Sequence, residues 1–182
     1  MRLLVSLLLI SAVASAVETD AKSAAIRGEI MEIERAIDRR FLDVRDETPM
    51  TMLGNTRGVY LLGYGAVFTV QLNLVPTAGL SPFRGSYSEE EKRQLNIRKR
   101  QRLETLEQRA REILVEESEK LHSLSADEKV AFSVALFHFA WEDLTQLPGQ
   151  LVASATKTSL DGARAGRLDV AEVRRRLDVR YF

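Results

Sequence analysis

The sequence predicts an α+β fold: an antiparallel sheet of two hairpins packed against an N-terminal helix and a long central helix. Three observations support this prediction. Apolar residues recur every three or four positions over residues 20–45, and two apolar segments near residues 57–75 and 129–157 each have the length and turn signals of a hairpin. A long, highly charged helical segment lies between these two hairpins. Helices and antiparallel pairs in this order favour a sandwich of two or three layers.

The first predicted element is an amphipathic helix over residues 20–45. Its apolar positions have the spacing of one helical face and comprise Ile26, Ile30, Ile33, Ile37, Phe41 and Val44. A coiled-coil seam has a similar spacing, but this stripe is short, so packing onto a sheet is favoured. Pro49 marks the end of the helix.

The next predicted element is a hairpin over residues 57–75. Its second half alternates apolar and polar residues with the period of a strand, with Phe68, Val70, Leu72 and Leu74 on one face. Gly63-Tyr64-Gly65 has the composition of a three-residue hairpin loop that needs positive φ. A short strand over residues 50–53 is expected to precede this hairpin.

A long helix is predicted from Ser88 to about Ser123. Ser88 and Glu91 have the spacing of a capping box, which marks a helix start. The apolar stripe of this helix is narrow, so much of its surface is expected to face solvent. Its first turns carry a basic cluster of Lys92, Arg93, Arg98, Lys99, Arg100 and Arg102.

The second predicted hairpin has strands at residues 129–140 and 149–157. For the first of these segments, two interpretations remain. Ser125 and Glu128 form another capping-box pattern, which favours a helix, whereas the continuous apolar run with three phenylalanines and the turn-like segment after it favour a strand. We adopt the strand, and therefore expect a hairpin here.

Two short helices are predicted to close the chain. One ends near Gly162–Gly166, and the other runs from Asp169, a good N-cap residue, to about Val179. The sequence contains no internal repeat and no low-complexity segment. We therefore expect residues 17–182 to form a single domain.

The beginning of the chain has the features of a secretory signal peptide. Arg2 supplies a positive charge, residues 3–10 are apolar apart from one serine, and Ala14-Ser15-Ala16 places small residues at the positions required for cleavage. The apolar run is too short to span a bilayer core of about 30 Å. A buried N-terminal helix is the alternative. We expect removal of residues 1–16, so that the chain from Val17 works in the periplasm or outside the cell.

Composition narrows the function classes. The chain has 26 basic and 26 acidic residues, whereas a nucleic-acid-binding domain usually has a large basic excess. It contains no cysteine, so a disulfide framework, a thiol nucleophile and a cysteine metal site are all excluded. At this length, a single domain can bury about 70% of its unfolded surface.

No catalytic motif is recognisable. His138 and Glu142 are four residues apart and could ligate a metal from one helical face, but a histidine at the edge of the core beside Trp141 is favoured. We therefore predict neither a cofactor nor a metal. If the protein were a hydrolase, its site would gather Tyr60, Tyr64, His138, Glu142 and Asp143.

The basic cluster at the start of the long helix has two interpretations. It is either a solvated surface with charge pairs along the helix, or a docking surface for an anionic membrane or an acidic partner. We predict an exported, non-enzymatic domain that binds a protein or envelope partner, with a hydrolase or small-molecule binder as the alternative. The candidate binding residues are Arg98, Lys99, Arg100, Tyr64, His138 and Trp141.

Two segments carry a resemblance to other proteins. GVYLLGYGAVFTVQLNLV (58–75) and FHFAWEDLTQLPGQLVASATKTSLD (137–161) resemble segments of small exported bacterial proteins of unknown function. In those proteins the glycine–tyrosine–glycine hairpin and a tryptophan–acidic pair occur in the same order. The resemblance implies no activity and no site residues.

Overall fold

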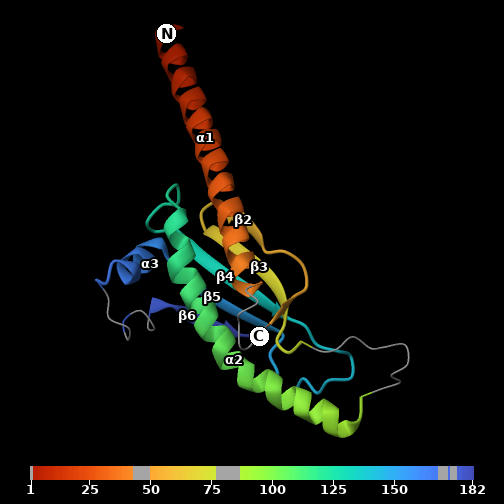
Figure 1. The fold of residues 1–182 in the computed structure, drawn as a ribbon. Helices are drawn as coiled ribbons and strands as arrows, with labels where there is room; N and C mark the ends of the chain where they lie inside the picture. The colour runs from red at the N-terminus through yellow and green to blue at the C-terminus, as the bar shows by residue number, and fades with distance from the viewer. Residues whose placement is uncertain (1, 43–49, 77–86, 168–171, 173–175) are drawn as a thin grey trace.

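The α+β fold is confirmed by a computed structural model, which describes residues 2–42, 50–76, 87–167, 172 and 176–182, with side chains from residue 22 onward. Three helices and a mixed six-stranded sheet make up this part of the chain (Figure 1). The elements in order are α1 (Arg2–Phe41), β1 (Thr51–Met52), β2 (Arg57–Leu61), β3 (Gly65–Asn73), α2 (Glu89–Glu117), the 3₁₀ turn η1 (Ser118–Lys120), β4 (Lys129–Leu136), β5 (Gln150–Thr156), α3 (Lys157–Arg164) and β6 (Asp178–Tyr181).

Both predicted hairpins are present, and a parallel pair joins them into one sheet. β2 pairs antiparallel with β3, and β4 pairs antiparallel with β5. β3 and β4 pair in parallel, from Gly65 opposite Lys129 to Leu72 opposite Leu136. Parallel neighbours need a long crossover, which α2 and its flanking segments supply. The sheet is therefore mixed, in the order β1-β3-β4-β5-β6, with β2 also paired to β3.

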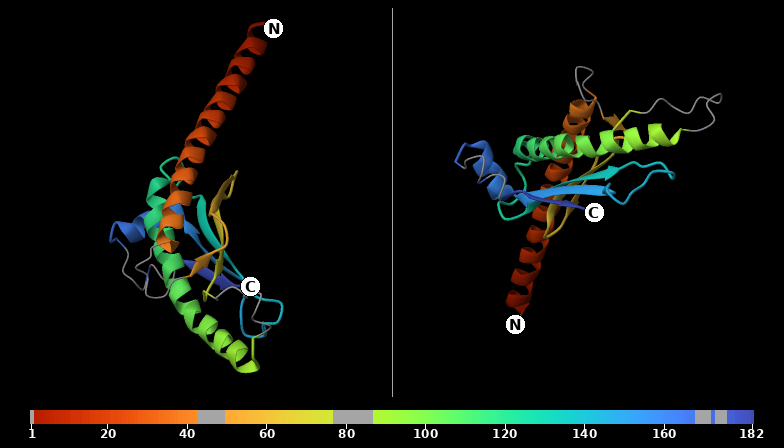
Figure 2. Two further views of the ribbon diagram at one scale, coloured as in Figure 1. Left: turned by 45° about the vertical axis from the view of Figure 1, so that its right-hand side comes forward. Right: turned by 90° about the horizontal axis from the view of Figure 1, so that it is seen from below.

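The core lies between the sheet and the two long helices. Figure 2 shows α1 and α2 on the same face of the sheet, crossing each other. The predicted stripe of α1 is buried there from Ile26 to Phe41, where the helix ends. Val44 and Pro49 lie outside the described residues. The sheet contributes its alternating inward residues, which in the central strands are Ala66, Phe68, Val70, Leu72, Val130, Phe132, Val134 and Leu136.

The long helix begins as predicted. Ser88 is its N-cap: the hydroxyl accepts a hydrogen bond from the Glu91 backbone N–H, and the Glu91 carboxylate accepts one from the Ser88 N–H. This arrangement satisfies two backbone donors that a helix start leaves free. α2 ends at Glu117 and the η1 turn extends it to Lys120, close to the predicted end at Ser123.

The ambiguous segment after Ser125 is a strand. The Ser125 backbone N–H donates to the Glu128 carboxylate at 2.7 Å, as in a capping box, but the turn leads into β4 at Lys129. The Ser125–Glu128 pattern is compatible with either a helix or a strand after it. The segment is a strand because it pairs with β3 on one side and with β5 on the other. Residues 137–149 then form the connection between β4 and β5.

The hairpin turn between β2 and β3 depends on glycine. The turn comprises residues 62–64, one position earlier than predicted, and Gly63 and Gly65 have φ values of 77° and 128°. A Cβ atom at Gly65 would collide with the backbone carbonyl of Lys129 on β4. Gly65 is therefore needed both for its φ value and for the close approach of β4.

The predicted final helix is wrong at its C-terminal end. Residues 178–181 form β6, which pairs antiparallel with β5, and Asp169 lies outside the described residues. A four-residue strand is too short for its alternation to stand out in the sequence, and its pairing with β5 depends on the fold. The preceding helix, α3, does end before Gly166, as predicted.

Candidate binding site at the start of the central helix

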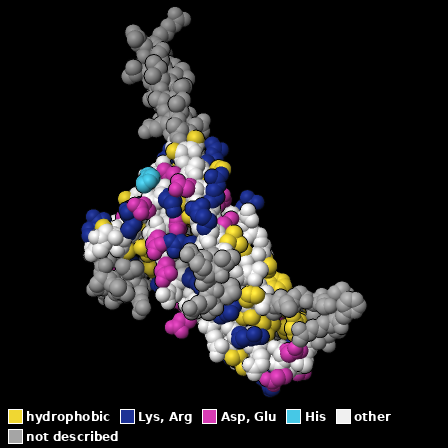
Figure 3. Space-filling view, viewed as in Figure 1, with side chains coloured by type: hydrophobic (Ala, Val, Ile, Leu, Met, Phe, Trp, Pro, Cys, Tyr) yellow, Lys and Arg dark blue, Asp and Glu magenta, His cyan; other side chains and the backbone are white. Residues whose placement is uncertain are grey.

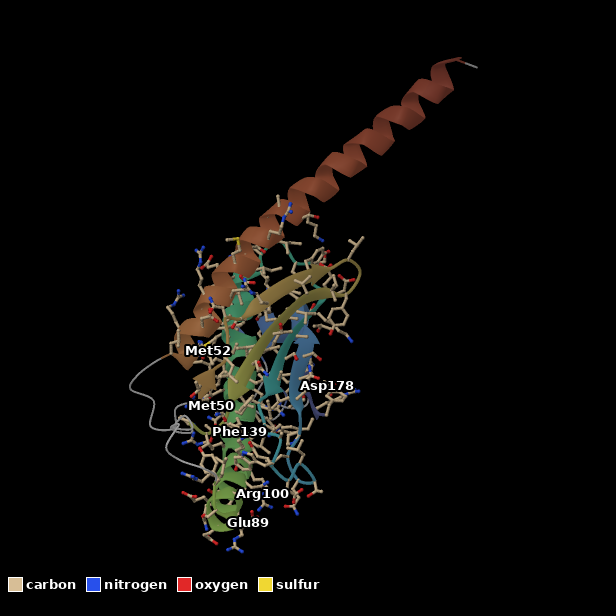
Figure 4. All side chains as sticks on the ribbon, turned by 90° about the vertical axis from the view of Figure 1, so that its right-hand side faces the viewer. Met50, Met52, Glu89, Arg100, Phe139 and Asp178 are labelled. Atoms are coloured by element: carbon tan, nitrogen blue, oxygen red, sulfur yellow. The ribbon has the colours of Figure 1, made fainter. Side chains whose placement is uncertain are left out.

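Five of the six candidate binding residues come from two segments, residues 98–100 and 138–141. The structure brings these segments together at one end of the sheet, where the N-terminal half of α2 meets the β4–β5 connection. Figure 4 shows Glu89, Arg100 and Phe139 at this end of the molecule. Tyr64, the sixth residue, lies at the opposite end, in the β2–β3 turn.

A buried ion pair links the two segments. The Lys99 ammonium lies 2.7 Å from the Glu142 carboxylate and donates a second hydrogen bond to the Phe137 carbonyl at 2.9 Å. The two charged side chains are 0% and 2% exposed. Burial lowers the pKa of Lys99, and the hydrogen bond and negative charge of Glu142 only partly offset this effect.

Lys99 is therefore not part of a docking surface, contrary to the expectation from the sequence. It lies four residues after Leu95 and seven before Leu106, on the buried face of α2. The charged side chain occupies a core position because Glu142 provides a partner there. Removing either partner would leave the other charge buried and unpaired.

Aromatic rings surround this pair. Phe139 and Trp141 stack with their centroids 5.1 Å apart, and Phe137 packs edge-on against Phe139 at 4.9 Å. The Lys99 ammonium lies within 6 Å of the ring centroids of Phe137 and Phe139. These rings exclude water from the ion pair, and hydrogen bonds are stronger in such an environment.

His138 links the two ends of the β4–β5 connection through a hydrogen bond. Its Nε2 lies 2.9 Å from the Pro148 carbonyl oxygen, which can only accept, so Nε2 carries a hydrogen. Its Nδ1 faces the second carboxylate oxygen of Glu142 at 3.6 Å, and neither of these two atoms has a hydrogen-bond partner within the described structure. Across the described residues, no three His, Asp or Glu side chains form a group that could hold a metal ion.

A hollow of about 340 Å³ opens beside the ion pair. Its lining residues are Glu89, Lys92, Arg93, Asn96, Arg100, Trp141, Glu142, Asp143 and Gln146. Three of them are cations on α2. Lys92 pairs with Glu89 and Arg93 with Glu90, but the described partner of Arg100 is the neutral side-chain oxygen of Gln146. The guanidinium of Arg100 thus has no carboxylate as a hydrogen-bond partner in the described structure.

Several polar contacts fix the walls of the hollow. Asn96 donates to the Asp143 carbonyl at 2.8 Å, and Arg100 donates to Gln146. Asn96 lies three positions before Lys99 and four before Arg100, so it neighbours both side chains on α2. Asp143 accepts a hydrogen bond from the Thr145 N–H, which lowers its pKa, with a smaller effect from the charge of Arg100.

Arg98 lies on a different side of the helix. Its side chain is exposed, and its Nε lies 3.4 Å from the Gln94 carbonyl of the same helix. Residues two positions apart do not share a helical face. The three residues 98–100, which were predicted to form one surface, therefore lie in three different environments. Lys99 enters the core, Arg100 lines the hollow and Arg98 faces solvent elsewhere.

The set of residues expected for a hydrolase divides in a similar way. Glu142 and Asp143 line the hollow and His138 faces Glu142, whereas Tyr60 and Tyr64 lie at the hairpin end. There the Tyr60 hydroxyl donates to Glu128 at 2.6 Å, and this hydrogen bond raises the pKa of Tyr60. Asn96 and Gln146, which help to form the hollow, carried no recognisable signal in the sequence.

The surroundings of the site give no simple charge signature. On the face shown in Figure 3, acidic and basic side chains are mixed over α1 and α2.

Within the part of the chain that the structure describes, no helix combines the length and apolar character needed to cross a membrane. Comparisons with protein-family models, with curated proteins and with solved structures find no match to this chain.

Proposed function

We propose that the chain is an exported, non-enzymatic domain that binds an acidic protein partner of the cell envelope in the hollow between α2 and the β4–β5 connection. The observation that carries this proposal is the position of Arg100. Its guanidinium lines the hollow and, among the described residues, hydrogen-bonds to an amide oxygen and not to a carboxylate, although the charge of Asp143 lies nearby. Two further lining cations, Lys92 and Arg93, are paired with glutamates of α2. Arginine holds carboxylates with two parallel hydrogen bonds, so an acidic side chain is a suitable ligand.

The contacts that hold the walls of the hollow support this proposal. Its walls are held by the Lys99–Glu142 pair, by the contact of Asn96 with Asp143 and by the stacked ring of Trp141. A site that is already ordered loses less conformational entropy when it binds its partner. The long β4–β5 connection is also the kind of segment that often carries function in a compact domain.

A small-molecule site in the same hollow is the second candidate. Its volume of about 340 Å³ lies at the lower end of the range of small-ligand sites, which begins at about 300 Å³. A neutral ligand that donates a hydrogen bond to the exposed Asp143, which also lines the hollow, would bind independently of Arg100.

Export is part of the proposal and has its own test. The features of residues 1–16 support it, and in Figure 1 the N-terminal part of α1 extends away from the rest of the fold. The described contacts of α1 lie at Lys22 and beyond, so they would remain after cleavage. Mass spectrometry of the protein recovered from an exporting host should give Val17 as the first residue. Recovery of chains starting at Met1 from the cytoplasm alone would contradict export.

The binding proposal can be tested through the single tryptophan of the chain, because Trp141 lines the hollow. A glutamate-rich synthetic peptide is titrated into the protein, and the fluorescence of Trp141 reports binding. The same peptide with glutamine in place of glutamate is the ligand control. We expect saturable binding of the acidic peptide only, at low ionic strength, because salt screens exposed charges.

Two adjacent charge reversals provide a matched pair of variants. Arg100→Glu places a negative charge in the hollow and should weaken peptide binding by about tenfold or more. Arg98→Glu makes the same change of net charge on another side of α2, so its effect should be about twofold or less. Equal effects would contradict binding in the hollow. Binding of the glutamine peptide with unchanged affinity would favour the second candidate.

A further inference from the structure

The β2–β3 hairpin exposes an unusual amount of apolar surface at its end. Val59, Leu61, Leu62 and Tyr64 are 48%, 46%, 83% and 37% exposed, and we call these four residues the hairpin tip. Single exposed apolar residues are common, but a contiguous group of large ones usually marks an interaction surface. The tip is remote from the hollow, so its role is separate from the proposed function.

The exposure follows from the fold of the hairpin. Val59 and Leu61 project from one face of β2, while the alternate residues Gly58 and Tyr60 face the opposite way, toward α1. Leu62 lies in the turn itself, beyond the last paired residues. The four side chains therefore form a projecting end of the sheet, and Figure 4 shows this turn on the side where α1 leaves the body.

The base of the hairpin is also held in place by contacts with α1 and β4. The Gly58 N–H donates to Glu34 of α1 at 2.7 Å. The Tyr60 hydroxyl donates to Glu128, which also pairs with Lys22 at 3.6 Å. Gly65 brings β3 directly against Lys129 of β4. These contacts fix the base of the hairpin and leave its tip in solvent.

We propose that the hairpin tip inserts into the surface of a lipid membrane. A projecting group of aliphatic side chains suits insertion between lipids better than it suits a groove-binding partner, because it offers no pocket. Tyrosine is typical of the membrane interface, and the Lys129 ammonium, 5.9 Å from the Tyr64 ring centroid, can meet anionic headgroups.

The absence of cysteine allows a direct test with single labels. Leu62→Cys and Leu144→Cys are each made in the full chain and labelled with an environment-sensitive fluorophore. Leu144 is the matched control, since it is an exposed leucine, 51% accessible, in the β4–β5 connection at the other end. Both labelled proteins are mixed with vesicles of phosphatidylcholine and phosphatidylglycerol in equal amounts.

The label at position 62 should shift its emission to the blue and brighten severalfold on addition of vesicles, while the label at position 144 should not change. An unchanged label at position 62 would overturn the proposal, and would turn attention to a protein that covers the tip. Equal changes at both positions would also overturn it, because they would indicate non-specific adsorption.

A second pair of variants separates the tip from the N-terminal residues, which are present in every sample. The double variant Leu61→Ser/Leu62→Ser should reduce co-sedimentation of the chain with the vesicles severalfold relative to Leu144→Ser. Since these leucines are exposed, all variants should fold, which circular dichroism checks. If the double variant sediments as well as the control, the tip does not contribute to membrane binding and the proposal fails.

Discussion

The two ends of the β3–β4 pair depart from the usual distribution of residues in opposite ways. At the hollow, the charged side chains of Lys99 and Glu142 are inside the protein. At the hairpin, the apolar side chains of Leu61 and Leu62 are outside it. Departures of this kind from the usual folding pattern tend to occur at functional sites. The two interaction sites that we propose therefore lie at opposite ends of one sheet.

The ends also differ in what holds them. The hollow depends on contacts between segments distant in sequence, since α2 is tied to the β4–β5 connection by charge and by amide hydrogen bonds. The hairpin depends largely on backbone conformation, because Gly63 and Gly65 have positive φ. Substitutions at the hollow should therefore act through buried charge, and substitutions at the hairpin should act through strain or not at all.

The largest effect on stability is expected at the buried pair. Lys99→Met leaves the Glu142 carboxylate buried without its cation, and we expect it to lower the free energy of unfolding by about 3 to 5 kcal/mol, measured by urea denaturation. The double variant Lys99→Met/Glu142→Gln removes the uncompensated charge and keeps an acceptor for the Phe139 N–H. It should recover much of the loss. A loss below about 1 kcal/mol in the single variant would mean that the pair behaves as an exposed one.

The next largest effect is expected at the hairpin turn. Gly65→Ala both strains a φ of 128° and drives a Cβ atom into the Lys129 carbonyl, so we expect a loss of about 2 to 4 kcal/mol. Gly63→Ala has a φ of 77° but open space around the new atom, and should lose only about 1 kcal/mol. Thermal and urea unfolding measure both. Equal losses would show that the close approach of β3 to β4 is less tight than described.

These first two predictions concern features that differ in how visible they are in the sequence. The glycine turn, the capping box at Ser88 and the apolar stripe of α1 were predicted, because each depends on residues close together in the chain. The burial of Lys99 was not predicted, although its spacing from Leu95 and Leu106 places it on the apolar face. A lysine side chain is usually exposed to solvent, so Lys99 was expected at the surface. Only the fold brings its partner Glu142 next to it.

The parts of the fold that were missed also depend on distant contacts. The parallel pairing of β3 with β4 produces no recognisable pattern in the sequence, because the residues around each strand predict only its antiparallel partner in a hairpin. β6 consists of four residues whose pairing with β5 brings together Val179 and Ala153. In the candidate site, Asn96 and Gln146 have polar side chains like many others on the surface, and only tertiary geometry places them around one hollow.

A smaller, pH-dependent effect is expected at the base of the hairpin. Burial alone would raise the pKa of Glu128, but hydrogen bonds from Tyr60 and Ser125 and the charge of Lys22 outweigh it, so the pKa lies below its ordinary value of 4.5. Because the folded-state pKa is lowered, the stabilising contribution is present above pH 4.5 and is lost as the pH falls through the folded-state value. Urea unfolding across this range should therefore show a shallower acid-side loss for Glu128→Gln than for the unmodified chain. Identical pH profiles would contradict the role of Glu128.

The smallest effect on stability is expected at the hairpin tip. Leu62 is almost fully exposed, so Leu62→Ser should change the free energy of unfolding by less than about 0.5 kcal/mol. Leu72→Ala on β3, where the side chain is buried in the core, should cost about 2 to 5 kcal/mol in the same assay. A large loss for Leu62→Ser would mean that the tip packs against the protein rather than facing solvent.

The most direct test of two separate sites is a crossed binding measurement on the full chain carrying the label at position 62. Glutamate-rich peptide and anionic vesicles are each titrated against the labelled protein and against the same protein with Arg100→Glu or Leu61→Ser. Arg100→Glu should lose about tenfold or more in peptide affinity and keep the vesicle-induced emission shift, whereas Leu61→Ser should do the reverse. If either substitution weakens both interactions together, the two ends do not act as independent sites.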